Sequence, residues 1–275
     1  MNLKNVPSFL FFLGAIFVHA KSPSFIESAE TLPPGVWTLE TSLLMRDNPV
    51  DFGIADRDYE IRAPQFKLAL GAGQIIEIQL EGDAAVWMKN LDGETSTNSG
   101  DWTLATKVWF ATETEKRPSM SFYYAVKLPN GSDELGGATD ETDFFAHLLF
   151  DKSLSEKIRA HGVLGLGILG NPFTNAAQND VISYGLSLDY RFNRKNWLIW
   201  DIGGETGPKV KDDPKGMQFG WSHDFTKWTG FGAVGFGFGD DQENFRFLLG
   251  MRRQFGPIKR NPPQRRHRGN LTFGA

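Results

Sequence analysis

Apolar and polar residues alternate at every second position over long stretches of this sequence, and no other feature constrains the fold as strongly. Between residues 181 and 192, one face would carry Ile182, Tyr184, Leu186, Leu188, Tyr190 and Phe192. The opposite face would carry Ser183, Gly185, Ser187, Asp189 and Arg191. A period of two is that of a β-strand, because a helix would scatter the apolar side chains around its axis. The pattern therefore predicts an all-β protein.

About twelve such segments follow one another along the chain. They cover approximately residues 35–46, 58–71, 74–82, 101–113, 118–128, 142–150, 157–170, 179–192, 197–204, 215–225, 228–239 and 244–255. Most exceed the roughly 5–6 residues usual in soluble domains. They suit tilted strands that cross a bilayer, which need about 9–11 residues. Several apolar faces end in Trp, Tyr or Phe, which is typical of the aromatic girdles at membrane interfaces.

The connections between these segments alternate in length. Links after even-numbered strands are short, at residues 72–73, 114–117, 151–156, 193–196 and 226–227. Links after odd-numbered strands are longer, with about eleven residues from Asp47 and about eighteen from Gly82, and only the last, near Asp240, is short. Outer-membrane barrels show this rhythm, with short periplasmic turns and long external loops. An even strand number would place both chain termini in the periplasm.

We therefore predict a closed, antiparallel, up-and-down transmembrane β-barrel of about 12 strands over residues 35–255. Closure follows from the lipid environment, because each unpaired backbone group of an exposed sheet edge would be costly there. A soluble β-sandwich is the alternative, since it also alternates. It would have shorter strands, more Greek-key links and no regular change between short and long connections.

The N-terminus has the features of a secretory signal peptide over residues 1–20. Lys4 precedes an apolar run of about ten residues from Phe9 to Val18, and small residues end at Ala20. The run is too short for a spanning helix, which needs about 20 residues. This predicts export to the outer membrane. Residues 21–34 would form an N-terminal periplasmic segment, and the sequence leaves open whether it folds into the barrel as a short plug.

Charge is distributed unevenly along the chain. Residues 1–20 carry one base and no acid, and residues 256–275 carry five bases and no acid. Of the 29 bases and 33 acids of the chain, the body between these segments, residues 21–255, therefore holds 23 bases and all 33 acids. Such an acidic body argues against nucleic-acid binding. The Pro- and Arg-rich tail, residues 256–275, is predicted to be disordered. The strand that ends in Phe255 resembles the signal that barrel-insertion machinery reads, although twenty residues follow it.

Short motifs in the sequence resemble a family of bacterial outer-membrane transporters named for the meta-pathway of phenol degradation. The motifs are AETLPPGVW at 29–37, GDWTLATK at 100–107, YAVKLPNG at 124–131, GATD at 137–140 and TDFF at 142–145. The resemblance extends over most of residues 29–255. It implies a barrel that admits hydrophobic or aromatic compounds. It implies no ligand-binding residue at any position of this chain.

Several motifs suggest other chemistry, but their context favours a structural role. Residues 165–170 match G-x-G-x-x-G, yet Asn171-Pro172 follows where a dinucleotide site needs a helix, so we expect glycines that give room to lumen side chains. The stretch 222–224 reads Ser-His-Asp, but in a strand the histidine faces away from its neighbours. No spacing indicates a metal site, and the acidic loop at 133–143 lacks the order of a calcium loop. We expect no catalytic residue, cofactor or metal.

The polar faces of the strands carry the charged side chains that would line the interior, or lumen, of the barrel. The residues expected to point into the lumen are Glu77, Glu81, Lys107, Lys127, Asp189, Arg191, Asp201, Arg246 and Arg252, together with Glu40, Arg62 and Asp224. Both signs of charge occur, so pairs could bridge the interior. They would either fill and rigidify a narrow barrel or line a polar passage, and the strand number alone does not decide between these.

Three functions are compatible with such a barrel. The first is passive passage of small molecules, hydrophobic or aromatic ones included, across the outer membrane. The second is a structural or adhesive barrel whose long loops bind a ligand outside the cell. The third is a barrel lipid hydrolase, for which His147, His161 and His223 are the candidates. The expected surroundings are the lipid bilayer and lipopolysaccharide.

Overall fold

The computed structural model describes residues 26–49, 57–131, 141–170, 179–207, 215–226, 228–238 and 243–256. The predicted signal peptide, the basic tail and most of the acidic loop at 133–143 lie outside these residues. Fourteen β-strands form in the described part of the chain. A helix long and apolar enough to cross a membrane does not occur in this part.

The strands cover most of the described sequence. In chain order they are β1 (Trp37–Asp47), β2 (Arg57–Gly71), β3 (Ile76–Asp83), β4 (Val86–Asn90), β5 (Thr95–Asn98), β6 (Trp102–Ala111), β7 (Ser119–Leu128), β8 (Asp143–Ser153), β9 (Ile158–Leu169), β10 (Asn179–Arg191), β11 (Asn196–Thr206), β12 (Lys215–Asp224), β13 (Trp228–Gly237) and β14 (Phe245–Phe255).

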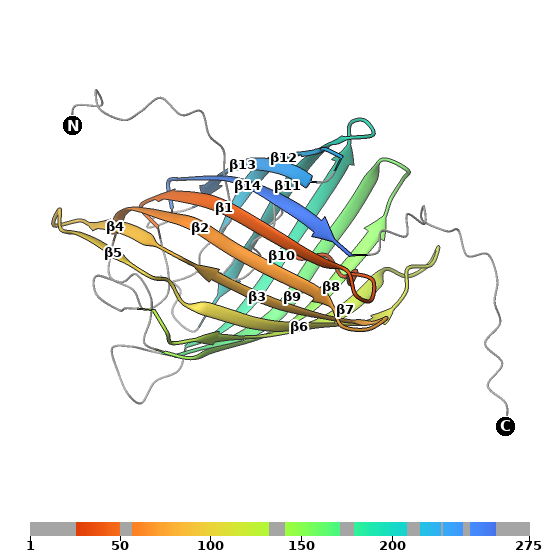
Figure 1. Ribbon diagram of the computed structural model, residues 1–275, viewed down its shortest axis with the longest axis horizontal. Helices are drawn as coiled ribbons and strands as arrows, with labels where there is room; N and C mark the ends of the chain where they lie inside the picture. Colours follow the sequence, from red (N-terminus) through yellow and green to blue (C-terminus); the bar gives the residue numbers. More distant parts are fainter. Residues whose placement is uncertain are drawn as a thin grey trace.

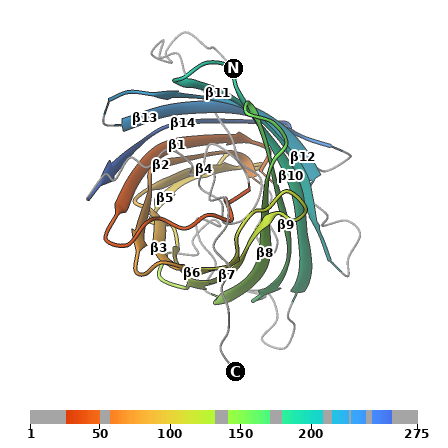
Figure 2. The same ribbon diagram turned by 90° about the vertical axis from the view of Figure 1, so that its right-hand side faces the viewer.

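The sheet closes on itself (Figures 1 and 2). All pairings are antiparallel, and β1 pairs with β14 along its whole length, from Trp37 opposite Phe255 to Asp47 opposite Phe245. The other side of β1 pairs with β2. Every strand except β5, which pairs with β4 alone, therefore has two neighbours. The ring of strands is closed, which removes the continuous unpaired sheet edge that lipid would not tolerate. The closed up-and-down barrel predicted from the sequence is confirmed.

Fourteen strands make twelve barrel positions, because two positions are occupied by two strands each. β3 and β4 both pair with β2, and the hydrogen bonds from Ala84 N to Pro64 O and from Ala63 N to Ala85 O, both 3.0 Å, carry the ladder across the break between them. β5 and β6 pair with β4 and β3 and continue the next position in the same way. The predicted number of about twelve strands is therefore confirmed.

The prediction of a long loop after Gly82 is wrong. The chain instead extends through β4 and returns through β5, with a tight turn between Asn90 and Glu94 that places Gly93 at a φ of 89°. The Ser, Thr, Asn and Gly content of this stretch suggests a loop, but cross-strand pairing satisfies its backbone groups better than water exposure of an isolated loop. The hairpin makes two neighbouring barrel positions longer than the rest (Figure 1).

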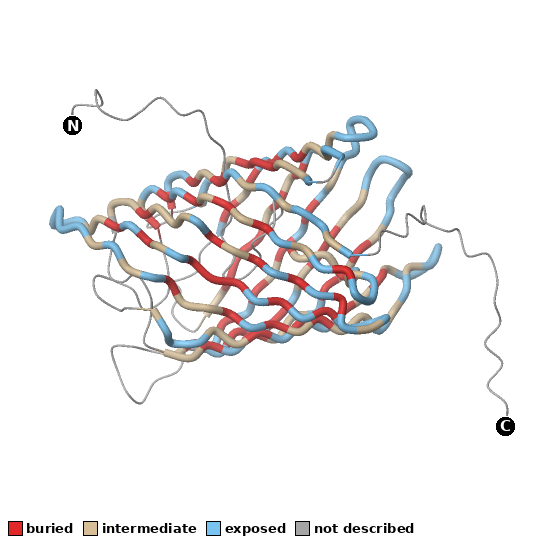
Figure 3. The backbone as a smooth tube through the Cα atoms, in the orientation of Figure 1, coloured by how far each residue is buried: buried red, intermediate tan, exposed pale blue. Residues whose placement is uncertain are grey.

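Buried and exposed residues alternate along the barrel strands (Figure 3). Large apolar side chains face out, such as Leu166, which is 60% exposed, and Leu186, which is 63% exposed. Charged side chains such as Glu81, Lys107 and Asp201 are buried in the interior. Water-soluble proteins place these residue classes the other way round. The outer wall therefore fits hydrocarbon, and a soluble sandwich is excluded.

Aromatic side chains gather at one end of the barrel, where β1 and β13 begin and β12 and β14 end. Trp37 stacks on Phe255 with ring centroids 4.0 Å apart, and the guanidinium of Arg253 lies 5.0 Å from the Phe255 ring centroid. Phe225 stacks on Trp228 at 3.8 Å. Amphipathic rings beside cations are typical of the membrane–water interface. This end, which carries the short turns, is called the turn end below, and the opposite end is called the loop end.

Candidate functional site in the barrel interior

The chain enters the barrel before it forms the first strand. Residues 26–36 curve from the start of β1 across the opening of the turn end and into the ring of strands (Figure 2). Ile26 and Ala29 are buried, with 3% and 0% exposure. We call residues 26–32 the plug segment. Residues 21–25, which belong to the same predicted periplasmic segment, lie outside the described residues.

Glu27 of the plug segment contacts three strands of the wall. Its carboxylate lies 2.6 Å from Nζ of Lys67 on β2 and 2.9 Å from Nζ of Lys107 on β6, and it accepts a 3.2 Å hydrogen bond from Gln79 on β3. Burial opposes the charge of Glu27, but the two ammonium groups outweigh it and hold the pKa of this carboxyl below its usual range. The contact therefore contributes stability above the usual carboxyl pKa and is lost only as the pH falls well below it.

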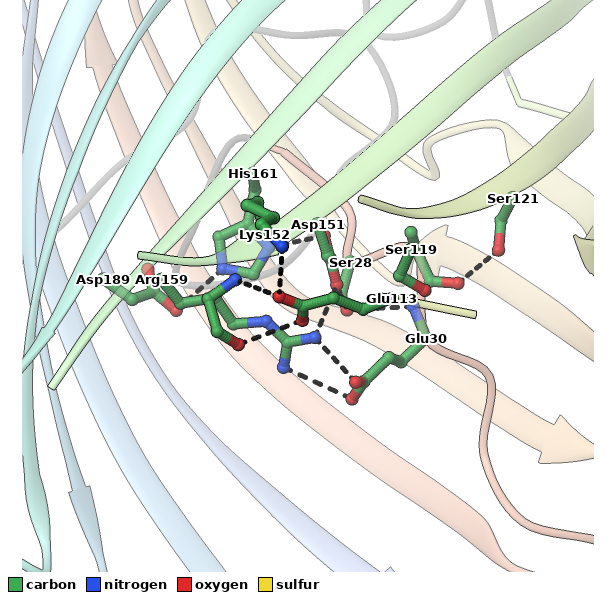
Figure 4. A network of polar contacts seen from close by, with 12 residues as sticks. Ser28, Glu30, Glu113, Ser119, Ser121, Asp151, Lys152, Arg159, His161 and Asp189 are labelled. Atoms are coloured by element: carbon green, nitrogen blue, oxygen red, sulfur yellow. Dashed lines mark hydrogen bonds and ion pairs between the residues drawn. The ribbon is translucent and has the colours of Figure 1, made fainter. Parts of the chain in front are cut away.

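Two further side chains attach the plug segment to β8 and β9 (Figure 4). The Ser28 hydroxyl donates a 2.7 Å hydrogen bond to Asp151, and Arg159 approaches Glu30 to 2.6 Å. Asp151 is completely buried and is also 2.7 Å from Nδ1 of His161. The contacts of the plug segment thus extend along the wall from β2 and β3 to β8 and β9.

Backbone groups of the plug segment are satisfied by the wall as well. The Leu32 amide donates to Glu77 at 2.7 Å, and Lys107 donates to the carbonyl of Ser28 at 3.0 Å. The Ser121 hydroxyl donates to the carbonyl of Ala29. The segment thus uses hydrogen bonds and ion pairs with strands of the wall instead of joining the sheet as a strand of its own. Such contacts can exchange with water or solute one at a time, unlike a continuous strand pairing.

The interior also contains apolar surfaces that strict alternation did not predict. One cluster combines Ala29 of the plug segment with the wall residues Ala105, Tyr123, Ala125, Phe145, Leu149, Leu169 and Val181. A second cluster consists of Leu44, Phe231, Ala233 and Leu248, on β1, β13 and β14. The lumen is therefore amphipathic, with charged and apolar wall regions side by side.

Glycines on β9 make room for the first cluster. A Cβ atom at Gly165 would lie 2.0 Å from the His147 ring, and one at Gly167 would lie 3.1 Å from the Phe145 ring and 2.8 Å from Val181. These glycines belong to the G-x-G-x-x-G match, and they lie within a strand, without the helix that a dinucleotide site requires. The predicted structural role of these glycines is confirmed.

Four of the predicted lumen residues lie close to the plug segment or to its partners. Glu77 and Lys107 pair with each other at 3.1 Å and both contact the plug segment. Glu81 pairs with Lys67 at 3.0 Å. Asp189 lies 3.2 Å from Nε2 of His161. The structure brings these residues together around one segment.

The other predicted lumen residues on β7, β11 and β14 lie in separate pairs. Lys127 approaches Asp143 to 2.5 Å, and Arg252 approaches Glu40 to 3.0 Å. Asp201, fully buried, accepts a 2.7 Å hydrogen bond from Gln218. The guanidinium of Arg246, 1% exposed, pairs with Glu243 at the loop end.

Three further predicted residues lie near strand ends or on the neighbouring wall. Arg62 bridges Glu60 and Asp83. Asp224 accepts a hydrogen bond from Thr229 at 2.7 Å. Arg191 is exposed at the turn end, where it donates to the carbonyl of Glu156 and lies over the Trp197 ring. Arg191 thus belongs to the rim.

Sequence reasoning missed the residues that attach the plug segment. Glu27, Ser28 and Glu30 lie outside any alternating stretch, so no period marks them. Lys67 and Asp151 lie at inward positions of β2 and β8, two residues from Gln65 and Leu149. A stricter reading of alternation could have added these two residues to the lumen set.

The three histidines do not show the serine–histidine pair of a hydrolase in the described residues. Both ring nitrogens of His161 face carboxylates, those of Asp151 and Asp189. His147 packs over Gly165, and its Nε2 is buried without a hydrogen-bond partner. His223 lies 2.9 Å from Asn196. A catalytic serine activated by any of these rings is therefore not part of this arrangement. Likewise, no group of three or more potential metal ligands occurs among the residues described.

These features define the class of the molecule, an outer-membrane type β-barrel of twelve positions with an apolar outer wall and a charged interior. The sequence pattern of the family described as "Putative MetA-pathway of phenol degradation" matches residues 20–253, and the chain belongs to this family. The family resemblance inferred from the short motifs is thereby confirmed.

Solved structures show the same fold at low sequence identity. The NanC porin is 9% identical, with a TM-score of 0.54, and the match covers 78% of this chain and 98% of that chain. The translocator domain of the autotransporter NalP from Neisseria meningitidis is 10% identical, with a TM-score of 0.50, and the match covers 82% of this chain and 90% of that chain. A search of curated proteins finds no significant match.

Proposed function

We propose that this protein is an outer-membrane channel for the passive passage of small molecules and that the plug segment forms its closed state. The observation that supports this proposal most is the position of residues 26–32 inside the barrel. A barrel that serves only as structure would fill its interior with side chains of its own wall. Here Lys67, Lys107 and Arg159 of the wall pair with a segment that is not part of the wall.

The solutes we propose include hydrophobic and aromatic molecules. Tyr123, Phe145 and Leu149 form an apolar stretch of the inner wall, and Phe231 lies in a second one. Apolar wall regions beside charged ones suit solutes that carry both kinds of surface. The description of the family, which concerns phenol degradation, supports the same solute class. In this proposal the protein has no enzymatic activity.

The proposed setting is the bacterial outer membrane, reached by export through the signal peptide at residues 1–20 and by insertion machinery that reads the strand ending in Phe255. Both termini would lie in the periplasm, so the plug segment would close the barrel from the periplasmic side. The long loops would face lipopolysaccharide.

Weakening the plug contacts should open the channel. In the double variant Glu27→Gln, Glu30→Gln, two ion-paired side chains of the plug segment lose their charge. A weakening of about 1–3 kcal/mol at each of the two positions should raise the open fraction at least about tenfold. Planar-bilayer conductance measures this. Glu94→Gln is the control, because Glu94 is bonded to Asn90 in the β4–β5 turn at the loop end, away from residues 26–32. Equal open fractions in the double variant and the control would contradict the proposal.

A further inference from the structure

The carboxylate of Glu27 is held as a bound ligand would be held. One oxygen lies 2.6 Å from Nζ of Lys67, and the other lies 2.9 Å from Nζ of Lys107 and 3.2 Å from Nε2 of Gln79. The three donors come from β2, β6 and β3, which are neighbours in the wall. Glu27 itself comes from the plug segment, so the wall provides a complete carboxylate site and the segment only fills it.

The wall residues of this site are held in place by further contacts that do not involve the plug segment. Lys67 also pairs with Glu81 at 3.0 Å, and Lys107 also pairs with Glu77 at 3.1 Å. These wall carboxylates would hold both ammonium groups in place, because a buried charge without a partner is costly. Departure of Glu27 would therefore leave two oriented ammonium donors without one of their partners, together with the Gln79 amide.

An apolar surface adjoins the carboxylate site. Ala29 follows Glu27 by two residues and packs, with 0% exposure, in the cluster that contains Tyr123, Phe145 and Leu149. The plug segment thus presents a carboxylate and a small apolar group in succession. A solute that replaced it would meet ammonium and amide donors at one end and an aromatic and aliphatic wall at the other.

We propose that this part of the lumen is a solute-binding site for small organic carboxylates with an apolar, ring-like body, and that Glu27 competes with them for it. The route by which such a solute reaches the site rests on the proposed channel function. The donors of Lys67, Lys107 and Gln79 that point at Glu27 need an acceptor. A neutral alcohol offers one uncharged acceptor oxygen, and a protonated amine offers none, whereas a carboxylate accepts charge-assisted hydrogen bonds with both oxygens. The site therefore selects for a negative charge, and the apolar wall selects for the body that carries it.

Isothermal titration calorimetry on the full chain in detergent tests this, with benzoate, benzyl alcohol and benzylamine as probes that share a ring and differ in charge. In the Glu27→Gln variant the competitor loses its charge, so benzoate should bind at least about tenfold more tightly than in the unaltered protein, a difference of about 1.4 kcal/mol. Benzyl alcohol and benzylamine should gain less than about twofold, which is about 0.4 kcal/mol on the same scale.

Adding Lys107→Gln to Glu27→Gln should abolish the gain for benzoate, and adding Lys107→Arg should preserve most of it. If circular dichroism shows that the Lys107→Gln variant does not fold, Lys67→Gln takes its place in the test. Lys152→Gln is the matched control, because Lys152 contacts the β6–β7 turn region and not the plug segment. The proposal is overturned if benzyl alcohol gains as much as benzoate, or if the benzoate gain survives the Lys→Gln substitution.

The measurement needs no membrane, so its failure is separate from a failure of the channel function. Tight, charge-selective benzoate binding in a barrel that never conducts would keep this inference and reject passage. Conductance in the opened variants without selective benzoate binding would keep passage and reject this inference.

Discussion

Deletion of residues 26–32 should convert a closed barrel into an open one. The deletion removes the bonds of Glu27, Ser28 and Glu30 with the wall and takes Ala29 out of the apolar cluster. Each of these interactions is worth about 1 kcal/mol or more, so without them the closed state has nothing left to favour it, and the effect exceeds that of any single substitution. Liposomes that contain the variant should swell in a neutral sugar at a rate at least about ten times that of the unaltered protein.

The control for this deletion is a change in an exposed turn elsewhere. Replacing residues 91–94, the exposed tip between β4 and β5, by Gly and Ser alters a turn that contacts no plug residue. That variant should swell liposomes no faster than the unaltered protein. If the deletion of residues 26–32 also leaves the rate unchanged, then side chains of the wall close the barrel and the plug segment is only an attachment.

Leu166→Arg should strongly destabilise the barrel in a membrane. Leu166 lies within β9, faces outward and is 60% exposed. On the lipid face of a barrel an arginine costs about 2–4 kcal/mol at the bilayer midplane and less toward the interfaces. For Leu166→Arg, within the span of β9, we expect a cost of about 2 kcal/mol. In water a surface substitution of this kind changes stability by only about 0.5 kcal/mol. Urea unfolding of the protein in phospholipid vesicles, followed by tryptophan fluorescence, measures the difference.

Leu154→Arg is the matched control, because Leu154 is also 60% exposed but lies in the turn between β8 and β9. The same substitution there should change the unfolding free energy by less than about 0.5 kcal/mol. Equal effects of the two substitutions would mean that the outer wall does not face lipid, whatever the shape of the barrel.

The barrel could be predicted from the sequence because the pattern that specifies it lies within single strands. Alternation in stretches such as 181–192 decides which face of a strand meets lipid, and that face is apolar at every second residue. Closure then follows from the backbone, since an open edge is not tolerated in lipid. The pairing of β4 with β5 escaped prediction because β5 and the turn before it consist of residue types common in loops, and β4 has only five residues. β4 is held in place by its pairing with β2.

The plug segment could not be derived from periodicity. Residues 26–32 form no strand, and their placement depends on donors and acceptors contributed by strands far along the chain, such as Lys107 and Arg159. Likewise, the charged residues predicted to face the lumen were chosen one strand at a time, so their partners across strands stayed unknown. The ion pairs between Glu27 and its two lysines span 40 and 80 residues of sequence. A single sequence carries no sign of such pairings.

A reversible lock on the plug segment tests the central claim most directly. The chain has no cysteine, so Ser28→Cys and Asp151→Cys introduce one defined pair, at positions whose side-chain oxygens lie 2.7 Å apart. The pair is placed in the Glu27→Gln background, in which openings should be frequent, and planar-bilayer conductance is recorded before and after a reductant is added. The oxidised protein should stay closed and should begin to conduct when the disulfide is reduced. Equal conductance in the oxidised and reduced states would contradict gating by this segment.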